Sequence, residues 1–189
     1  MKRIIFLLLI VTLVVTLFGC TDKKTEQSST DIDAFRDITP QNIFEETGCQ
    51  IFKNGKTCES YLLYEGNLYT LGIGFGGLGI VDIVTADFDG NGEKELLYTY
   101  SWGSGLHRSC FGYFDLSAKH EAEVNISSIQ SLGFIQEELV LTKVSDTQFE
   151  VFTATATIEG GDFSKLTYEK DRLFGKIEAV DNKPVFFIE

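Results

Sequence analysis

Apolar and polar residues alternate along most of the chain in short runs. A period of two places apolar side chains on one face of a β-strand, and the runs are rich in Val, Ile, Thr, Phe and Tyr, which favour strands. The predicted strands are Ser60 to Tyr64, Leu68 to Ile73, Val81 to Ala86, Glu95 to Trp102, Cys110 to Leu116, Leu139 to Val144, Phe149 to Ile158, and paired runs between Leu166 and Ile188.

The breaks between these runs contain Gly, Asn, Asp and Ser, which favour tight turns. Short strands joined by such turns predict a mainly β fold, a small antiparallel β domain with sandwich-like or blade-like sheets. One short N-terminal helix is expected between Pro40 and Gly48, because Thr39 is a capping residue type, proline suits the first helical position and glycine suits the end. The segment from Glu121 to Gln136 has mixed signals, and its fold stays open.

The chain begins with a segment of different character. Lys2 and Arg3 precede an uncharged apolar run from Ile4 to Phe18, which is the pattern of a secretory signal. The run holds fifteen residues. A helix that spans a membrane needs roughly 20. A retained membrane helix is therefore disfavoured.

The residues Leu17-Phe18-Gly19-Cys20 resemble the lipobox of bacterial lipoproteins, in which the cysteine receives a diacylglyceryl group and becomes the new amino terminus. The resemblance implies a signal peptide at 1–19, a lipidated Cys20 carrying acyl chains such as palmitate, and attachment to the extracytoplasmic face of a cell membrane. An ordinary secreted protein is the alternative. Residues 20–30 are then the lipidated cysteine and a flexible polar tether, and 31–189 form a single mainly β domain.

Charge narrows the choice of partners. The chain has a net charge of −12, and removal of Lys2 and Arg3 with the signal leaves 14 basic against 28 acidic side chains, a formal charge of −14. This balance disfavours binding to nucleic acid or lying flat on an anionic lipid surface. Cations are the natural partners of such a surface.

The acidic loop, residues 87–95 (DFDGNGEKE), is the most informative stretch of the chain. Oxygen-bearing side chains stand at alternate positions, with Gly92 where a sharp turn needs a residue without a Cβ. Calcium prefers six to eight oxygen ligands, and loops with ligands at alternate positions supply them. The predicted ligands are Asp87, Asp89, Asn91, Glu93 through its backbone carbonyl, and Glu95. A plain hairpin turn with acidic residues facing water is the alternative.

An EF-hand would need a glutamate where Tyr98 stands, and helices on both sides of the loop. The loop instead resembles the D-x-[DN]-x-[DN]-G-x-x-[DE]-L loop of FG-GAP and VCBS repeats, and Phe75-Gly76-Gly77 upstream extends the resemblance. It implies a structural Ca²⁺ on the same five residues. Those families stack about four or more repeats into a propeller. One acidic loop is present here, so we expect a blade-like unit inside a different small β fold.

The residues after the acidic loop offer a possible ligand surface. Tyr98, Tyr100 and Trp102 alternate, which places them on one face of a strand, and Phe111 and Tyr113 are expected beside them if a hairpin closes between the two strands. The aromatic row is either core or a ligand platform, and core packing is favoured. The possible ligand surface consists of Tyr98, Tyr100, Trp102, His107 and Arg108.

Two further features leave alternatives open. Ser104 and His107 suggest a hydrolase that uses the 103–109 loop, although the glycine spacing of a nucleophile elbow is missing.

Cys49 and Cys58 form a possible disulfide across a hairpin turn at Asn54-Gly55, but a two-residue turn would place them diagonally, at the limit of bridging distance. Cys110 is the competing partner or a free thiol.

These observations favour a non-catalytic protein: a lipid-anchored, calcium-stabilised module that binds an unknown surface or envelope ligand. The alternatives are a surface hydrolase and a structural or inhibitory partner of another envelope protein. The expected partners are the membrane, through the anchor, and that ligand, with no nucleic acid.

Overall fold

A computed structural model describes residues 34–122, 124–127 and 135–189. Within this part of the chain the protein is mainly β, as the alternating pattern predicts. The strands form three sheets of four, four and five strands. All neighbouring strands pair antiparallel except one short parallel pair, β13 with β9. The expected signal peptide at 1–19 and the whole of the expected tether at 20–30, with Cys20, lie outside the described residues.

The first sheet has the order β1-β2-β3-β4 and the second the order β5-β6-β7-β8. Their strands are β1 (Phe35–Asp37), β2 (Gln50–Asn54), β3 (Ser60–Tyr64), β4 (Asn67–Leu71), β5 (Gly79–Ala86), β6 (Glu95–Trp102), β7 (Arg108–Asp115) and β8 (His120–Ala122). The third sheet has the order β10-β11-β12-β13-β9. Its strands are β9 (Asn125–Ile126), β10 (Glu138–Lys143), β11 (Gln148–Ile158), β12 (Leu166–Val180) and β13 (Lys183–Ile188), with a short 3₁₀ helix, η2 (Glu159–Gly161), between β11 and β12.

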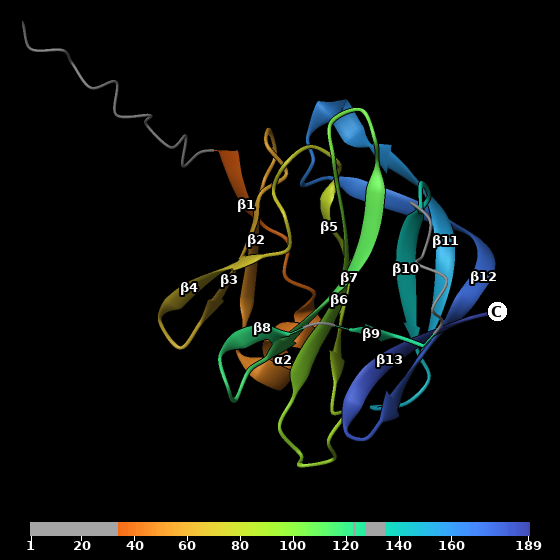
Figure 1. Cartoon of the computed structure of the whole chain (residues 1–189). Coiled ribbons are helices and arrows are strands. Elements are labelled where there is room, and N and C mark those ends of the chain that lie inside the picture. The colour runs from red at the N-terminus through yellow and green to blue at the C-terminus, as the bar shows by residue number, and fades with distance from the viewer. Residues whose placement is uncertain (1–33, 123, 128–134) are drawn as a thin grey trace, which may run out of the picture. The chain divides into compact units, whose positions relative to one another are not determined.

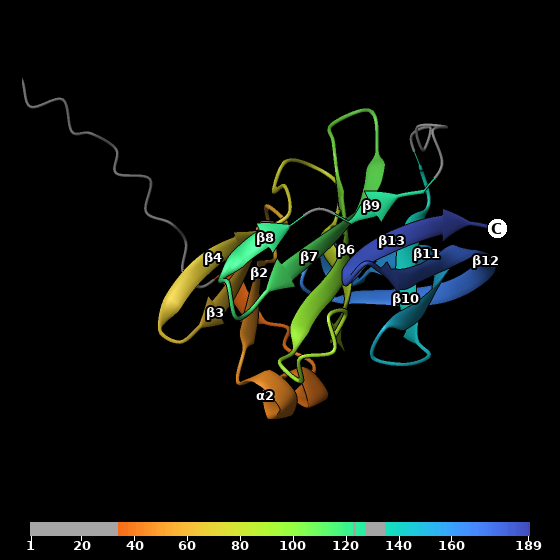
Figure 2. The ribbon, with the colours of Figure 1, turned by 60° about the horizontal axis from the view of Figure 1, so that its bottom comes forward.

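The second sheet lies between the other two (Figures 1 and 2). Leu96 and Tyr98 of β6 pack with residues of the first sheet, whereas Leu97 between them packs with residues of the third. Polar contacts join the second and third sheets as well, since Thr99 Oγ1 donates to the Leu139 carbonyl (2.6 Å) and the Leu141 N–H donates to Asp82 Oδ2 (2.7 Å). Both faces of this sheet are therefore covered, which explains why β6 is apolar or aromatic at most positions.

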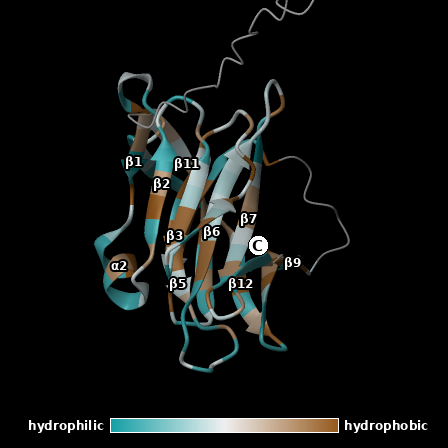
Figure 3. Cartoon of the chain, turned by 90° about the vertical axis from the view of Figure 1, so that its left-hand side faces the viewer, coloured by the Kyte–Doolittle hydropathy of each residue, from teal (hydrophilic) through white to brown (hydrophobic). Residues whose placement is uncertain are grey.

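The expected helix is present as α2 (Gln41–Thr47), but it begins differently from the prediction. Pro40 has extended dihedral angles and occupies the N-cap, and Thr39 does not cap the helix. The Thr39 hydroxyl instead donates to Asp37 and accepts the Ile51 N–H (2.7 Å), so it joins the chain before the helix to β2. Gly48 ends the helix in the left-handed region, as predicted. Most of α2 is hydrophilic (Figure 3), and its buried residue, Ile43, packs in the core between the first two sheets.

The hairpin of β6 and β7 corrects one expectation about the aromatic residues. Tyr98, Tyr100 and Trp102 pair with Gly112, Cys110 and Arg108, while Phe111 and Tyr113 pair with Thr99 and Leu97. Directly paired residues lie on the same face of a sheet. Phe111 and Tyr113 therefore lie on the opposite face from the aromatic row, toward the third sheet, because the hairpin register differs by one residue from the one that would align all five.

The strands define two ends of the domain. The acidic end contains residues 87–94, the β3–β4 turn and α2, which is joined to β5 by a hydrogen bond from Thr85 Oγ1 to Glu46 Oε2 (2.6 Å). The glycine-loop end contains the loops 72–78 and 103–107, the β2–β3 turn and Ala34. No helix among the described residues is long and apolar enough to cross a membrane.

Candidate metal centre

The acidic loop connects β5 to β6, whose residues Ala86 and Glu95 face each other in the sheet. Gly90 and Gly92 have φ values of +70° and +86°, in the left-handed region where glycine is favoured. Side-chain oxygens fold the loop back on itself: Asp89 Oδ1 accepts the Asn91 N–H (3.1 Å), and Asn91 Oδ1 accepts the Glu93 N–H (2.6 Å). The alternating oxygens of the sequence therefore curl the backbone around a common centre.

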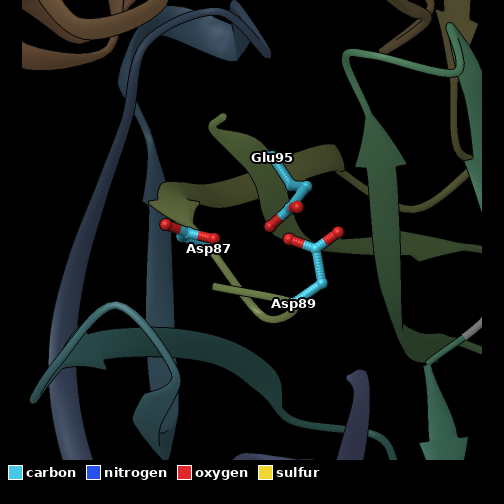
Figure 4. Close-up of side chains that lie close together, drawn as sticks. All are labelled: Asp87, Asp89 and Glu95. Carbon is cyan, nitrogen blue, oxygen red and sulfur yellow. The ribbon is translucent and has the colours of Figure 1, made fainter. Parts of the chain in front are cut away.

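Three carboxylates meet inside this loop (Figure 4). One oxygen from each of Asp87, Asp89 and Glu95 lies within 4.8 Å of the others. Glu95 is only 4% exposed, whereas Asp89 is exposed to solvent. The group is therefore buried at Glu95 and open to solvent at Asp89, so an ion could enter it from solvent.

Backbone N–H groups hold part of this cluster. Glu95 Oε2 accepts the Phe88 N–H (3.0 Å), and Asp87 Oδ2 accepts the Gly92 N–H (3.1 Å). The other oxygen of Asp87, Oδ1, is buried and has no hydrogen-bond partner within the described part of the chain. A buried charged oxygen without a partner is costly. This oxygen is therefore a candidate ligand for a cation.

Electrostatics point the same way. Burial, with a smaller contribution from the nearby Asp89 and Asp87, raises the pKa of Glu95 to about 7, against the opposing effect of the Phe88 N–H. The basic residue of the loop, Lys94, attracts Asp87 but makes its ion pair outside the group, with Nζ 2.9 Å from Asp146 Oδ2. Asp146 also pairs with Lys143 at 2.6 Å. Three carboxylates therefore share a partly buried space without a basic side chain among them.

The structure brings together three of the five predicted ligands. Asn91 lies beside the group, with Nδ2 donating to Asp89 Oδ2 (2.9 Å), while both Asn91 and Glu93 are exposed. The carboxylate of Glu93 is not part of the three-carboxylate cluster, and the expected role of its backbone carbonyl stays a prediction. The donors are all hard oxygens, so the residues fit Ca²⁺ better than metals that prefer nitrogen or sulfur.

A surface pocket of about 490 Å³ adjoins the acidic loop. Residues of α2, the β3–β4 turn, the acidic loop and the β7–β8 turn line it: Glu46, Thr47, Tyr64, Glu65, Gly92, Glu93, Lys94, Leu116, Ser117 and Lys119. Sequence reasoning missed this pocket, because its lining comes from four separate segments without a shared motif. It places exposed polar groups and one tyrosine within reach of a ligand beside the acidic loop.

The predicted ligand surface is wrong for Tyr98. Its side chain is 0% exposed, its hydroxyl donates to Glu121, and its ring packs over Gly112, where an added Cβ would lie 2.2 Å from a ring carbon. Tyr100 is half-buried against the same core. Two of the three residues in the aromatic row therefore serve the core.

The other three residues of that surface lie at the glycine-loop end. The Arg108 guanidinium lies 4.8 Å from the centre of the Trp102 ring, and His107 Nε2 pairs with Glu138 Oε1 at 2.8 Å. All three are partly exposed. Because β6 begins at the acidic loop and ends at Trp102, these residues do not adjoin the candidate metal centre.

The hairpin loop does not form the arrangement expected of a hydrolase. Among the described residues, no hydrogen bond joins Ser104 to His107, whereas Ser109 Oγ lies 3.5 Å from His107 Nε2. Ser109 Oγ donates to the Glu137 carbonyl (2.7 Å). Both Ser109 and Glu138 approach the same ring nitrogen, whereas a proton relay needs the acid and the nucleophile on opposite nitrogens.

The possible disulfide between Cys49 and Cys58 is not formed, since both are buried free thiols. The β2–β3 turn spans residues 55–59 rather than two residues, and Lys53 pairs with Ser60. Cys49 consequently precedes β2 at one end of the sheet, and Cys58 precedes β3 at the other. Cys58 Sγ donates to the Gly76 carbonyl (3.1 Å). Cys110 is also a free thiol, and it lies opposite Tyr100 in the register of β6 and β7.

Searches against protein-family models, curated proteins and solved structures found no significant match to this chain. The resemblances to the lipobox and to FG-GAP and VCBS loops therefore stay predictions from the sequence.

Proposed function

We propose that this chain is a lipid-anchored, extracytoplasmic module that is stabilised by one calcium ion and binds a ligand without catalysis. The observation that carries the calcium site is the buried, unpartnered Asp87 Oδ1 beside the carboxylates of Asp89 and Glu95. Asp87, Asp89 and Glu95 would hold the ion, with the Asn91 side chain and the Glu93 carbonyl as further oxygen donors. A bound Ca²⁺ supplies the positive charge that this cluster lacks.

The role of the ion in this proposal is structural. Asp87 continues directly from β5, Glu95 begins β6, and the Asp87 N–H donates to the Asp146 carbonyl in the β10–β11 turn (2.9 Å). An ion on these residues would therefore fix two strands of the second sheet and an adjacent turn of the third. Binding to the folded state alone raises stability as ligand concentration exceeds the dissociation constant.

The pocket beside the acidic loop supports a binding role. Its two lysines are already paired, Lys119 with Glu65 at 2.5 Å and Lys94 with Asp146. Glu93 and Tyr64 remain exposed or partly exposed on its wall. A ligand that offers hydroxyl or amine donors suits such a wall, and ordering of the acidic loop by calcium would order Gly92 and Glu93 with it.

The test is the thermal midpoint of the mature chain with millimolar CaCl₂ and with a chelator, on the wild type, on Asp89→Asn and on Asp171→Asn as control. Asp171 is an exposed aspartate on β12, away from the acidic loop. We expect calcium to raise the midpoint of the wild type and of Asp171→Asn but not of Asp89→Asn. At 100 times the dissociation constant the gain is about 2.7 kcal/mol.

An equal midpoint with calcium and chelator in the wild type would reduce the loop to an acidic hairpin turn. A calcium response that persists unchanged in Asp89→Asn would place the ion elsewhere on the protein. Direct calcium titration by calorimetry separates the two cases, since the second retains binding heat and the first has none.

A further inference from the structure

Apolar side chains project from two loops at the glycine-loop end. Phe75 is 62% exposed, Leu106 is 47% exposed and Ile73 is 42% exposed. Isolated exposed apolar residues are ordinary on a protein surface. Here they lie in two contacting loops, GIGFGGL at 72–78 and GSGLH at 103–107.

The two loops are joined to each other through their backbones. The Gly103 N–H donates to the Phe75 carbonyl (2.7 Å), and Gly76 bridges to Gly103. The approach is so close that a Cβ on Gly76 would lie 2.7 Å from the Gly103 carbonyl oxygen. Phe75 and Leu106 are therefore presented by a preformed pair of loops rather than by two independent ones.

The chain enters the domain at this same end. The Gly55 N–H donates to the Ala34 carbonyl (2.9 Å), and Cys58 in the same turn donates to the carbonyl of Gly76 (3.1 Å). A short series of contacts thus connects Ala34 to the apolar loops. Cys20 precedes Ala34 by 14 residues. A fully extended chain of that length reaches about 50 Å at most.

Trp102 and Arg108 flank one of these apolar loops. They are the last residue of β6 and the first of β7, at the base of the 103–107 loop, and the guanidinium covers the indole ring. Tryptophan is enriched at the boundary between lipid and water, and arginine can keep its charge in water while its stem lies along apolar surface. The apolar side chains therefore lie in the loops, and the amphipathic side chains of Trp102 and Arg108 lie at the base of the 103–107 loop.

We propose that Phe75, Leu106 and Ile73 insert into the interfacial region of the membrane that carries the anchor, with Trp102 at the level of the headgroups. This inference rests on the proposed lipid anchor at Cys20, which would keep the loops at high local concentration near the bilayer. Since the mature chain is strongly acidic, apolar contact rather than charge would hold them there. The acidic end, with its pocket, then faces away from the membrane.

The lone tryptophan of the chain makes this testable without a label. The full lipidated protein is reconstituted in phosphatidylcholine vesicles, with or without acyl chains brominated near the headgroup, and Trp102 fluorescence is compared. We expect the brominated lipid to quench Trp102 in the wild type. The double variant Phe75→Ser, Leu106→Ser should lose that quenching, while Leu68→Ser should keep it. Leu68 is 63% exposed but lies beside the β3–β4 turn, at the acidic end.

Flotation of the same samples separates this inference from the anchor. If the wild type floats with the vesicles and Trp102 is not quenched, the membrane-facing loops are rejected and the anchor stands. The membrane-facing loops are also rejected, and the anchor stands, if the brominated lipid quenches the double variant as strongly as the wild type. If the wild type does not float, both the anchor and this surface are rejected. Equal thermal midpoints of the three proteins show that the substitutions left the fold intact.

Discussion

Two buried carboxylate oxygens lack a partner among the described residues, and their surroundings differ. Glu138 Oε2 belongs to a side chain whose other oxygen accepts from Ser101 (3.2 Å) and pairs with His107 (2.8 Å). Asp87 Oδ1 instead belongs to a residue that forms a three-carboxylate group with Asp89 and Glu95. Lys53 attracts the Glu138 carboxylate, whereas the carboxylates around Asp87 have no basic side chain among them. This contrast is why we propose a metal ion at the first cluster and not at the second.

Lys53 gives the residue-scale prediction. It is buried between the first two sheets, with Nζ donating to the Ile80 carbonyl (2.7 Å). Burial lowers the pKa of Lys53 to about 8, against the opposing attraction of Cys58, Glu138 and Asp162. Between this value and the ordinary pKa of 10.5, the unfolded chain binds more protons at this lysine than the folded chain does. Its contribution to stability therefore rises with pH across that window and is lost as pH falls through about 8.

The measurement is the free energy of unfolding between pH 8 and 10.5 for the wild type and for Lys53→Met. The wild type should gain on the variant by up to about 3 kcal/mol across this range. Thiols and tyrosines titrate in both proteins and largely cancel in the difference. Lys183→Met, at an exposed position of β13, is the control and should run parallel to the wild type. A difference that stays flat with pH would show that Lys53 does not titrate in this window.

At the scale of elements, the second sheet depends on complementary shapes at β6 and β7. Tyr98 and Gly112 face each other across the two strands, and the tyrosine ring fills the space above the glycine. The ring is held in place by its hydroxyl bond to Glu121, whose Oε1 also accepts the Gly72 N–H (2.8 Å). Tyr98 thus has little freedom to move away from an added methyl group.

We therefore expect Gly112→Ala to lower the free energy of unfolding by about 1 to 3 kcal/mol, as overpacking of a filled core does. Urea denaturation measures the change. Thr70→Ala, on an exposed position of β4, is the matched control and should stay within about 0.5 kcal/mol of the wild type. If Gly112→Ala were as stable as the control, the ring would have to be free to shift, and the close packing of this pair would be refuted.

Local signals predicted the elements better than their partners. Alternation and turn residues identified most of the strands, and Gly48 identified the end of α2, because these features depend on a few neighbouring residues. The prediction of a two-residue β2–β3 turn at Asn54-Gly55 was wrong. The Asn54 side chain accepts the Lys56 and Thr57 N–H groups, which makes the turn longer. The burial of both faces of β6 was missed for a related reason: alternation does not indicate a second covering sheet.

At the candidate site, too, residues close in sequence could be predicted, whereas contacts between distant segments could not. Asp87, Asp89 and Glu95 could be named from the sequence because they lie within nine residues and their spacing has a chemical purpose. Asp146, which pairs with the lysine of the loop, lies 52 residues beyond it, and no motif connects the two. The pocket and the contact between the two glycine loops likewise depend on the packing of separate segments.

At the scale of the whole molecule, the sheets separate two surfaces. β6 runs from the acidic loop to the glycine-loop end, so a ligand in the acidic pocket and a membrane beneath the apolar loops would not compete for space. This arrangement suits a module that is held at a surface and meets its ligand on the other side. Under the proposed anchoring at Cys20, the anchor would bring the glycine-loop end toward the lipid.

The anchor itself is tested by Cys20→Ser in the full chain, followed in membrane and soluble fractions and by incorporation of labelled palmitate. Two acyl chains anchor stably, since each buried methylene contributes about 0.8 kcal/mol. The variant should lose the label and leave the membrane after an alkaline carbonate wash. Its calcium response should persist, because Cys20 precedes the described domain by 14 residues. Cys110→Ser, which removes a different thiol, should remain labelled and membrane-bound. If Cys20→Ser stayed in the membrane through the wash, the apolar run from Ile4 to Phe18 would be a retained anchor, and the lipobox assignment would be wrong.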